Sequence, residues 1–287
     1  MDFKEKIFQS ITYIASICTI VFLFGIILSL FFEGLPVLNF TSIKDFLFSK
    51  DWYPTMFPPK FGILSLIAGS FVVTLGALVI SIPLGLGAAI YISEIANKRV
   101  KEILKPLIEL LAGIPSVVYG LFGMAFLSPF LIKVFQVPIG LNAFNASIIL
   151  GIMVVPIISS MSEDALSTVP NSLREASLAL GANKWETIMK VVLPAAKSGV
   201  ISSIILGFGR AIGETMVVLM VAGGAAQIPD SIFDPVRPMP ATVAAEMGET
   251  AIGTPHFHAL FGIAIILFII TFISILIIEF VVMRRKK

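Results

Sequence analysis

The chain has 287 residues, of which 57% are hydrophobic and only 13% are charged, and its mean hydropathy of +1.01 is far above that of a soluble globular domain. These values predict an integral membrane protein. The net charge of +2 is too small to indicate nucleic-acid binding. The single cysteine, Cys18, excludes an internal disulfide and a cysteine-based metal cluster, and we expect it to be a small packing residue.

Six stretches of the sequence are long and apolar enough to form membrane-spanning helices, which need about 20 residues each. They lie at about 7–32, 63–92, 107–130, 143–161, 200–222 and 258–283. The first is too long for the core of a signal peptide, and no small-x-small cleavage site follows it, so we expect a retained helix. The sequence therefore predicts an all-α, six-span membrane protein with both termini on one side.

The distribution of lysine and arginine predicts which side that is, because positively charged loops stay in the cytoplasm. Of the 20 lysines and arginines, 14 lie at the termini or in the loops on their side, and one, Arg210, lies in a predicted span. The other five lie in the loops 33–62, 131–142 and 223–257. We therefore expect these three loops outside, and both termini in the cytoplasm.

The longest segment predicted on the cytoplasmic side, residues 171–194, has the pattern of two short helices. Its signals are a capping box at Ser172 and Glu175, a stop at Gly181, a second capping box at Asn183 and Glu186, and a break at Pro194. Each predicted helix has one apolar face. Such a hairpin could lie on the membrane surface or dock as a compact unit on a partner.

Several other features limit the possible chemistry. The sequence has no phosphate-cradling loop of the form G-x-x-x-x-G-K-[ST], and no nucleophile with a neighbouring base, so we do not expect this chain to be an enzyme. His256 and His258 are the only histidines and lack further metal ligands, so no metal or other cofactor is expected. We expect Glu246 and Glu249, in an outer loop, to face water.

The spacing in the hairpin resembles the coupling motif of ATP-binding-cassette importer permeases: E-A-A, three residues, G, nine residues, then I-x-L-P. The matching residues are Glu175, Ala176, Ser177, Gly181, Val191, Leu193 and Pro194. Ser177 stands for the second alanine and Val191 for the isoleucine. In that family the hairpin sits in a cleft of the ATPase subunit. The resemblance therefore implies ATPase coupling through Glu175, Ala176, Gly181, Leu193 and Pro194.

From Phe61 on, nearly the whole chain is similar to phosphate importer permeases of the PstC type. The similarity is carried by residues 61–94, by "LAGIPSVVYGLFG" (111–123), by "GRAIGETM" (209–216) and by residues 253–272. The PstA type is a close relative, and the methionine that follows Glu214 and Thr215 favours PstC. The resemblance implies a permease domain at 61–287, preceded by a first helix and outer loop at 1–60.

The resemblance also implies partners: a second permease of the PstA type, two cytoplasmic ATPase subunits of the PstB type and an extracytoplasmic phosphate-binding protein of the PstS type. ATP hydrolysis is then expected in the partner ATPase. The implied location is the inner, or cell, membrane of a bacterium or archaeon.

Two charges inside the fifth predicted span are the candidate cargo site. Arg210 and Glu214 are neighbours at i and i+4 on a helix, and with Ser203 and Gly207 they form a narrow stripe. A charge at the bilayer centre costs at least about 2.5 kcal/mol, so it must be paired or face a cavity. We expect the stripe to face the transport pathway, where the Arg210 guanidinium suits phosphate oxygens. The alternative is an ion pair that only locks the helix into its bundle.

The sequence thus predicts a permease subunit that forms half of the pathway of an ATP-driven phosphate importer. A permease for another oxyanion, such as sulfate or molybdate, remains open, because an arginine alone does not choose among tetrahedral anions. A secondary transporter or channel that works without an ATPase is a second alternative, and it would not need the coupling hairpin.

Overall fold

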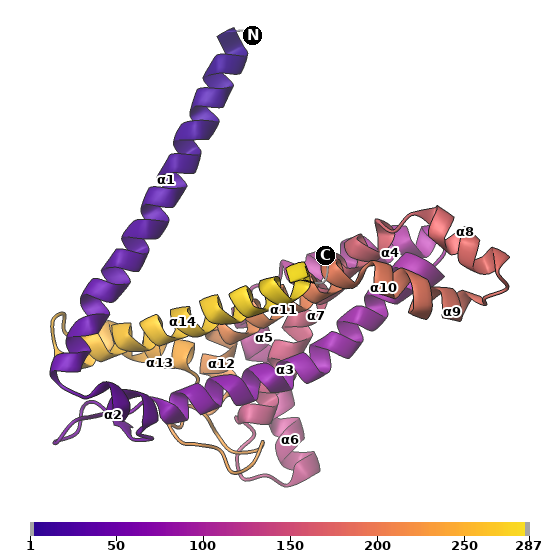
Figure 1. The fold of residues 1–287 in the computed structure, drawn as a ribbon. Helices are drawn as coiled ribbons and strands as arrows, with labels where there is room; N and C mark the ends of the chain where they lie inside the picture. The colour runs from indigo at the N-terminus through magenta and orange to yellow at the C-terminus, as the bar shows by residue number, and fades with distance from the viewer. Residues whose placement is uncertain (1–2, 285–287) are drawn as a thin grey trace.

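The computed structural model describes residues 3–284, with the side chains of residues 8–276 and of Phe280. It is a helical protein whose central helices form an elongated bundle (Figure 1). The helices are α1 (Phe3–Gly34), α2 (Ile43–Phe48), α3 (Leu64–Ile90), α4 (Lys98–Ala112), α5 (Ser116–Phe122), α6 (Ser128–Phe135), α7 (Ala143–Ser167), α8 (Asn171–Ala179), α9 (Lys184–Thr187), α10 (Leu193–Ala195), α11 (Lys197–Ile212), α12 (Met216–Val221), α13 (Met239–Glu246) and α14 (Pro255–Arg284).

Shorter elements extend or connect these helices. They are the 3-10 helices η1 (Leu35–Asn39) and η5 (Met247–Glu249), and the π-helical turns η2 (Tyr91–Ile95), η3 (Gly123–Leu127) and η4 (Ile188–Val192). Strands β1 (Trp52–Tyr53) and β2 (Lys60–Phe61) form a small antiparallel hairpin, in which Trp52 pairs with Phe61.

Five stretches in the described part of the chain are long and apolar enough to cross a membrane. They are Phe8–Asn39, Leu64–Ile95, Ser116–Phe135, Ala143–Ser167 and Pro255–Leu276. A sixth is formed if Lys184–Ala195 and Lys197–Ile212, which are bent by 71° at their junction, make one span. The prediction of an all-α membrane protein is confirmed, but the third and fifth predicted spans differ from the structure by more than a few residues at their ends.

The third predicted span, 107–130, is wrong at its start. Residues 98–112 form the separate amphipathic helix α4, and the apolar span begins only at Ser116. The helix ends because Gly113 caps it and because Ile114 precedes Pro115, a position that disfavours helical backbone. The apolar composition of residues 107–112 concealed this boundary.

The core of the bundle lies where α3, α7 and α11 pack together. Ala77 of α3, Leu150 and Val154 of α7 and Ala211 of α11 are all buried in one apolar cluster. The helices approach closely: a Cβ atom added to Gly85 of α3 would lie 2.9 Å from the Ile158 side chain of α7. This bundle is the scaffold that positions the candidate site.

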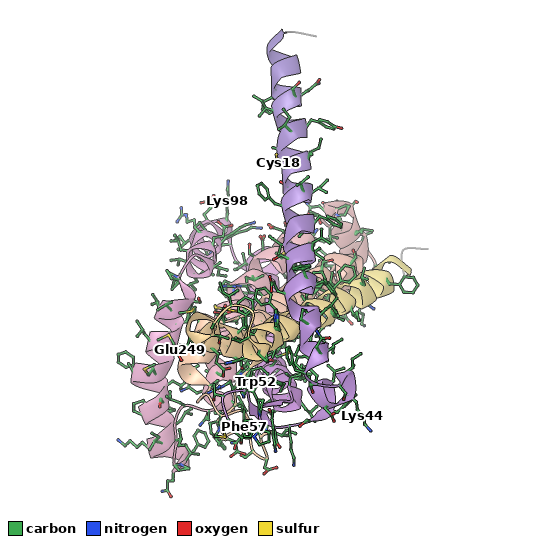
Figure 2. The ribbon with its side chains drawn as sticks, turned by 90° about the vertical axis from the view of Figure 1, so that its left-hand side faces the viewer. Cys18, Lys44, Trp52, Phe57, Lys98 and Glu249 are labelled. Atoms are coloured by element: carbon green, nitrogen blue, oxygen red, sulfur yellow. The ribbon has the colours of Figure 1, made fainter. Side chains whose placement is uncertain are left out.

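Helix α1 stands apart from this bundle. In Figure 1 it rises away from the other helices and meets α14 only near its C-terminal end, at Gly34. The expectation that Cys18 is a packing residue is wrong for this chain taken alone, because Cys18 lies on α1 and is exposed. Figure 2 shows Cys18 about halfway along α1, in the part of the helix that extends away from the bundle.

The structure gathers the predicted inner and outer loops at opposite ends. Trp52, from the loop 33–62, binds Glu246, and the rings of Phe135 and Phe233 lie 5.2 Å apart, so the predicted outer loops contact one another. At the other end, Lys105 binds Glu163. Figure 2 shows Lys98 far from Lys44, Trp52 and Phe57. The loops thus fall into the two groups that their charges predict.

Candidate functional site

The fifth predicted span, 200–222, is not one continuous helix. α11 ends at Ile212, and α12 begins at Met216. The Glu214 Oε1 atom accepts hydrogen bonds from the backbone N–H of Met216, at 3.1 Å, and of Val217, at 3.3 Å. In a continuous helix the Met216 N–H would bond to the Ile212 carbonyl. The Glu214 side chain replaces that carbonyl, so the span breaks beside the charged pair.

Arg210 and Glu214 are nevertheless neighbours, as predicted. The Arg210 Nη2 atom lies 3.2 Å from Glu214 Oε2, and only 2% of the Glu214 side chain is exposed, against 49% of the Arg210 side chain. One carboxylate oxygen therefore caps α12 while the other faces the guanidinium. The buried glutamate is fixed by the backbone, and the arginine that it holds stays accessible from outside the subunit.

The structure does not bring Ser203 and Gly207 to this accessible surface. Ser203 is fully buried, and its hydroxyl lies 2.7 Å from that of Ser162 on α7. A Cβ atom on Gly207 would lie 2.9 Å from Ile158, also on α7. In this conformation both residues pack α11 against α7. Their place in the transport pathway stays a prediction. Of the predicted stripe, Arg210 and Glu214 are the two residues that form the candidate site.

The predicted two-helix unit is present at the predicted inner end of the molecule, where α8 and α9 project beyond the bundle (Figure 1). Gly181 follows α8 with a φ of +87°, in the left-handed region, and the Ala182 N–H closes the turn on the Ser177 carbonyl. The second capping box is confirmed: the Asn183 side chain accepts from the Glu186 N–H, and Glu186 accepts from the Asn183 N–H. Gly181 thus turns the chain between two capped helices.

The first capping box is wrong. α8 begins at Asn171 with Pro170 in the N-cap position and no side-chain cap. Pro170 has the φ of −59° that its ring imposes, so the chain enters the helix earlier than the Ser172 signal predicts. Ser172 is therefore the second residue of the helix and Glu175 the fifth, so neither is at the cap.

The residues of the coupling motif are spread along this unit. Glu175, Ala176, Gly181 and Pro194 are exposed, and Leu193 is half-buried. Leu180 and Trp185 are large apolar side chains with 90% and 59% of their surface exposed. A groove of about 560 Å³ runs between the two arms and is lined by residues that include Leu173, Ala176, Leu180, Glu186 and Val191. Exposed apolar side chains around a groove are typical of a protein-binding surface.

Sequence reasoning missed a buried hydrogen bond inside this unit. The Ser177 and Thr187 hydroxyls lie 2.9 Å apart and join α8 to α9. Ser177 is one of the two departures from the coupling motif. The polar replacement has a partner on the facing arm, which the sequence alone did not show because the two residues are ten positions apart.

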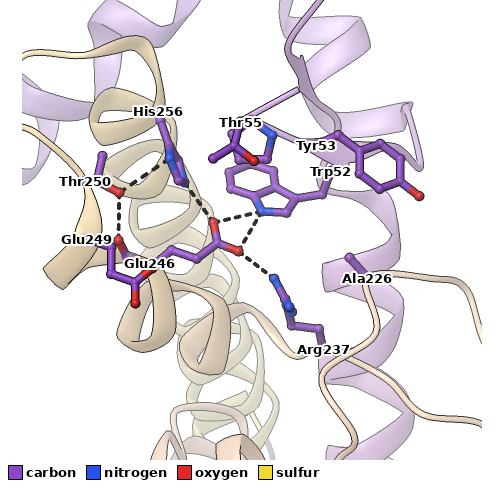
Figure 3. Close-up of a pocket in the computed structure, with 10 residues that line it drawn as sticks. Trp52, Tyr53, Thr55, Ala226, Arg237, Glu246, Glu249, Thr250 and His256 are labelled. Atoms are coloured by element: carbon purple, nitrogen blue, oxygen red, sulfur yellow. Dashed lines mark hydrogen bonds and ion pairs between the residues drawn. The ribbon is translucent and has the colours of Figure 1, made fainter. Parts of the chain in front are cut away.

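At the predicted outer end, the expectation that Glu246 faces water is wrong. Its side chain is 18% exposed and binds Trp52 Nε1 at 3.1 Å, His256 Nε2 at 2.8 Å and the Arg237 guanidinium (Figure 3). These residues line a pocket of about 420 Å³, and Glu249 lies at its exposed rim. Glu246 therefore joins β1, the loop before α13 and the start of α14. No local pattern could reveal this, because Trp52 and Glu246 are 194 residues apart.

The two histidines have protein partners. His256 lies beside Glu246, and His258 Nδ1 lies 2.7 Å from the Glu33 carbonyl oxygen. Among the described residues, no group of three or more histidine, cysteine, aspartate and glutamate side chains is arranged to hold a metal ion.

Comparison with known proteins assigns this architecture to a family. The family described as "Binding-protein-dependent transport system inner membrane component" matches residues 81–287. The chain is 40% identical to the probable ABC transporter permease protein YqgH of Bacillus subtilis, over 87% of this chain and 81% of the relative. It is 35% identical to the phosphate transport system permease protein PstC of Mesorhizobium japonicum, over 98% and 90% of the two chains.

Solved structures agree on the fold. A chain of a bacterial alginate ABC transporter, bound to a pentasaccharide-loaded periplasmic protein, matches 99% of this chain and 96% of its own length, with a TM-score of 0.69 and 13% identity. A chain of the inward-facing MetNI methionine ABC transporter matches 78% and 94%, with a TM-score of 0.58 and 21% identity. The chain belongs to the family of inner-membrane components of binding-protein-dependent transport systems.

Proposed function

We propose that this chain is a membrane permease subunit of an ATP-driven phosphate importer and forms half of its translocation pathway. The observation that carries the proposal is the similarity to a phosphate transport system permease over 98% of the chain, which includes the coupling hairpin. The proposed partners are a second permease of the PstA type, two ATPase subunits of the PstB type and a phosphate-binding protein of the PstS type.

The chemistry of the Arg210 site suits such a cargo. Phosphate near neutral pH is a mono- or dianion, and a guanidinium offers it a planar fork of charge-assisted donors. Glu214 is held by the N-terminus of α12 and lies beside Arg210 when no cargo is present. The cation is then never unpaired, and phosphate must compete with a carboxylate. This competition keeps binding weak enough for release, which conduction requires.

The inner hairpin supports a partner that hydrolyses ATP. Leu180 and Trp185 expose large apolar surfaces beside the groove between α8 and α9. An ATPase subunit that covers this surface would bury it. We place ATP hydrolysis in that partner and assign no catalysis and no cofactor to this chain.

We also propose that the hairpin and both termini lie in the cytoplasm. In a Cys18→Ala background, a cysteine at Lys184 should resist an impermeant thiol reagent in intact cells and react in inverted vesicles. Cys18 is exposed on α1, so it must be removed first. Labelling from outside the cell would reverse the orientation and remove the ATPase contact.

Reconstitution of the four-component complex tests the function. We expect ATP-dependent uptake of radiolabelled phosphate that unlabelled phosphate competes away far better than sulfate or molybdate does. Equal competition by sulfate or molybdate would make this a permease for another oxyanion. Phosphate movement by this chain without the ATPase subunits would instead support a channel or secondary transporter.

A further inference from the structure

A second arginine, Arg174, connects three elements at the inner end of the molecule. It lies in the first turn of α8. Its Nη2 and Nε atoms donate to the two carboxylate oxygens of Glu94, in η2 after α3, at 2.6 and 3.1 Å. The guanidinium also donates to the backbone carbonyls of Leu166, at 3.0 Å, and Val169, beside the end of α7. One side chain therefore ties the hairpin to both α3 and α7.

The geometry of this contact makes it rigid. Two parallel hydrogen bonds fix the angle between a guanidinium and a carboxylate as well as their distance. The Glu94 side chain is 7% exposed and the Arg174 side chain 19%. By contrast, the Lys190–Glu186 pair on the same hairpin is 73% and 40% exposed, with one contact at 3.3 Å. Water screens the second pair but largely not the first.

The other arm of the hairpin attaches to the same helices through apolar contacts. Val192 of η4 and Ala196, at the junction of α10 and α11, pack with Ala89 of α3 and with Leu166 and Val169 in one buried cluster. The hairpin is thus anchored by an ion pair on its first arm and by packing on its second. A shift of either arm would therefore disturb a contact with α3 or α7, and the second arm continues into α11, which carries Arg210.

A buried ion pair is an expensive way to gain stability, because desolvation offsets much of the attraction. An apolar pair could hold the hairpin equally well. The two directional hydrogen bonds between Arg174 and Glu94 suit a different role. They hold α8 at a fixed angle to α3, so that a movement of one helix is transmitted to the other.

We propose that the Arg174–Glu94 pair is the joint through which hairpin movement reaches α3 and α7, and that both are positioning residues of the transport cycle. This inference rests on the proposed function, because it needs an ATPase bound to the hairpin. Loss of this pair should therefore cause a specific defect. The ATPase should still close and hydrolyse ATP, but fewer of its closures should move the membrane helices.

The test measures ATP hydrolysis and radiolabelled phosphate uptake together, in proteoliposomes that hold the full complex with its binding protein. Glu94→Gln keeps the shape of the side chain and leaves Arg174 bonded to the two carbonyls. Arg174→Gln removes the guanidinium, and the double variant removes both partners. Lys60→Gln is the matched control, since it breaks an exposed ion pair, with Asp51, at the outer end.

We expect Glu94→Gln and Arg174→Gln to assemble and hydrolyse ATP while phosphate moved per ATP falls about tenfold, within the range of coupling between contacting residues. The double variant should be no worse than the more affected single variant, because both substitutions break one interaction. The Lys60→Gln complex should keep the normal ratio.

An unchanged ratio in Glu94→Gln would overturn the proposal. So would a loss of assembly in that variant, or hydrolysis and uptake that fall in parallel, since either result would mean that the pair only holds the fold together. If the unmodified complex moved no phosphate, the proposed function would fail before any variant was measured, so the two failures are distinguishable.

Discussion

The two arginine–glutamate pairs of this chain are built in opposite ways. Arg174 and Glu94 are 80 residues apart in sequence and meet through two hydrogen bonds with both side chains largely buried. Arg210 and Glu214 are four residues apart and meet through one contact of 3.2 Å, with the glutamate buried and the arginine half exposed. The first pair is largely shielded from solvent, and the second leaves its cation within reach of another anion.

This difference shows which pair is suited to exchange its partner. Arg174 also binds two backbone carbonyls, so an incoming anion would have to displace several fixed acceptors. Arg210 has one carboxylate beside it, at 3.2 Å, and that carboxylate also binds the N-terminus of α12. We therefore assign force transmission to the first pair and cargo contact to the second.

The largest expected effect comes from removing the accessible cation. Arg210→Ala should lower phosphate uptake per assembled complex at least about a hundredfold, since each hydrogen bond to a charged group contributes about 1.5–3 kcal/mol. Glu214 still caps α12 in this variant, so the complex should assemble. Arg210→Lys should recover little, because the ammonium lacks the planar fork. Uptake and pull-down of the partner subunits measure both quantities.

A smaller effect is expected from substitutions of Gly181, in the turn of the hairpin. They disturb the part of the molecule that contains Arg174 and leave Arg210 unchanged. No neighbouring atom would meet a Cβ at Gly181, so its φ of +87° sets the constraint rather than space. Gly181→Val should misplace α9 and reduce ATP-driven uptake, while Gly181→Asn should work nearly normally, because asparagine tolerates left-handed backbone.

Membrane insertion should survive in both Gly181 variants, since the turn lies outside the apolar spans. The measurement is uptake per assembled complex, with membrane content of the subunit as the control. Equal activity of the valine and asparagine variants would mean that the geometry of this turn does not matter for coupling.

The smallest effect is expected inside the hairpin. Ser177→Ala breaks the hydrogen bond to the buried Thr187 hydroxyl and should destabilise the subunit by about 1 kcal/mol. The Ser177→Ala/Thr187→Val double variant leaves no unpaired hydroxyl there, so it should regain most of that loss. Thermal unfolding of the detergent-solubilised complex tests this. A double variant less stable than Ser177→Ala would contradict the pairing.

Much of the fold could be predicted because membrane spans and helix stops are local signals. The span predicted at 63–92 is found at Leu64–Ile95, and the stretch predicted at 143–161 begins at Ala143. Gly181 has the backbone conformation that its position after a helix indicates. In each case the structure was determined by a run of apolar residues or by a single glycine.

Two of the failures have a common physical cause: one side chain determines the structure, and the sequence pattern does not show which partner it binds. The break after Ile212 depends on Glu214 accepting backbone hydrogen bonds, which an apolar count does not detect. The burial of Glu246 depends on Trp52, from a distant loop. For the site, sequence spacing correctly paired Arg210 with Glu214, but a helical stripe cannot tell which of its members face a neighbouring helix.

The most direct test of the cargo assignment removes both charges of the accessible pair and keeps the break in the helix. In the Arg210→Leu/Glu214→Gln double variant, the glutamine can still accept from the Met216 and Val217 N–H groups, and no uncompensated charge remains in the membrane. The measurement is ATP-driven uptake of radiolabelled phosphate per assembled complex. We predict normal assembly with almost no uptake. Substantial uptake would show that Arg210 only pairs with Glu214 and is not the partner of the cargo.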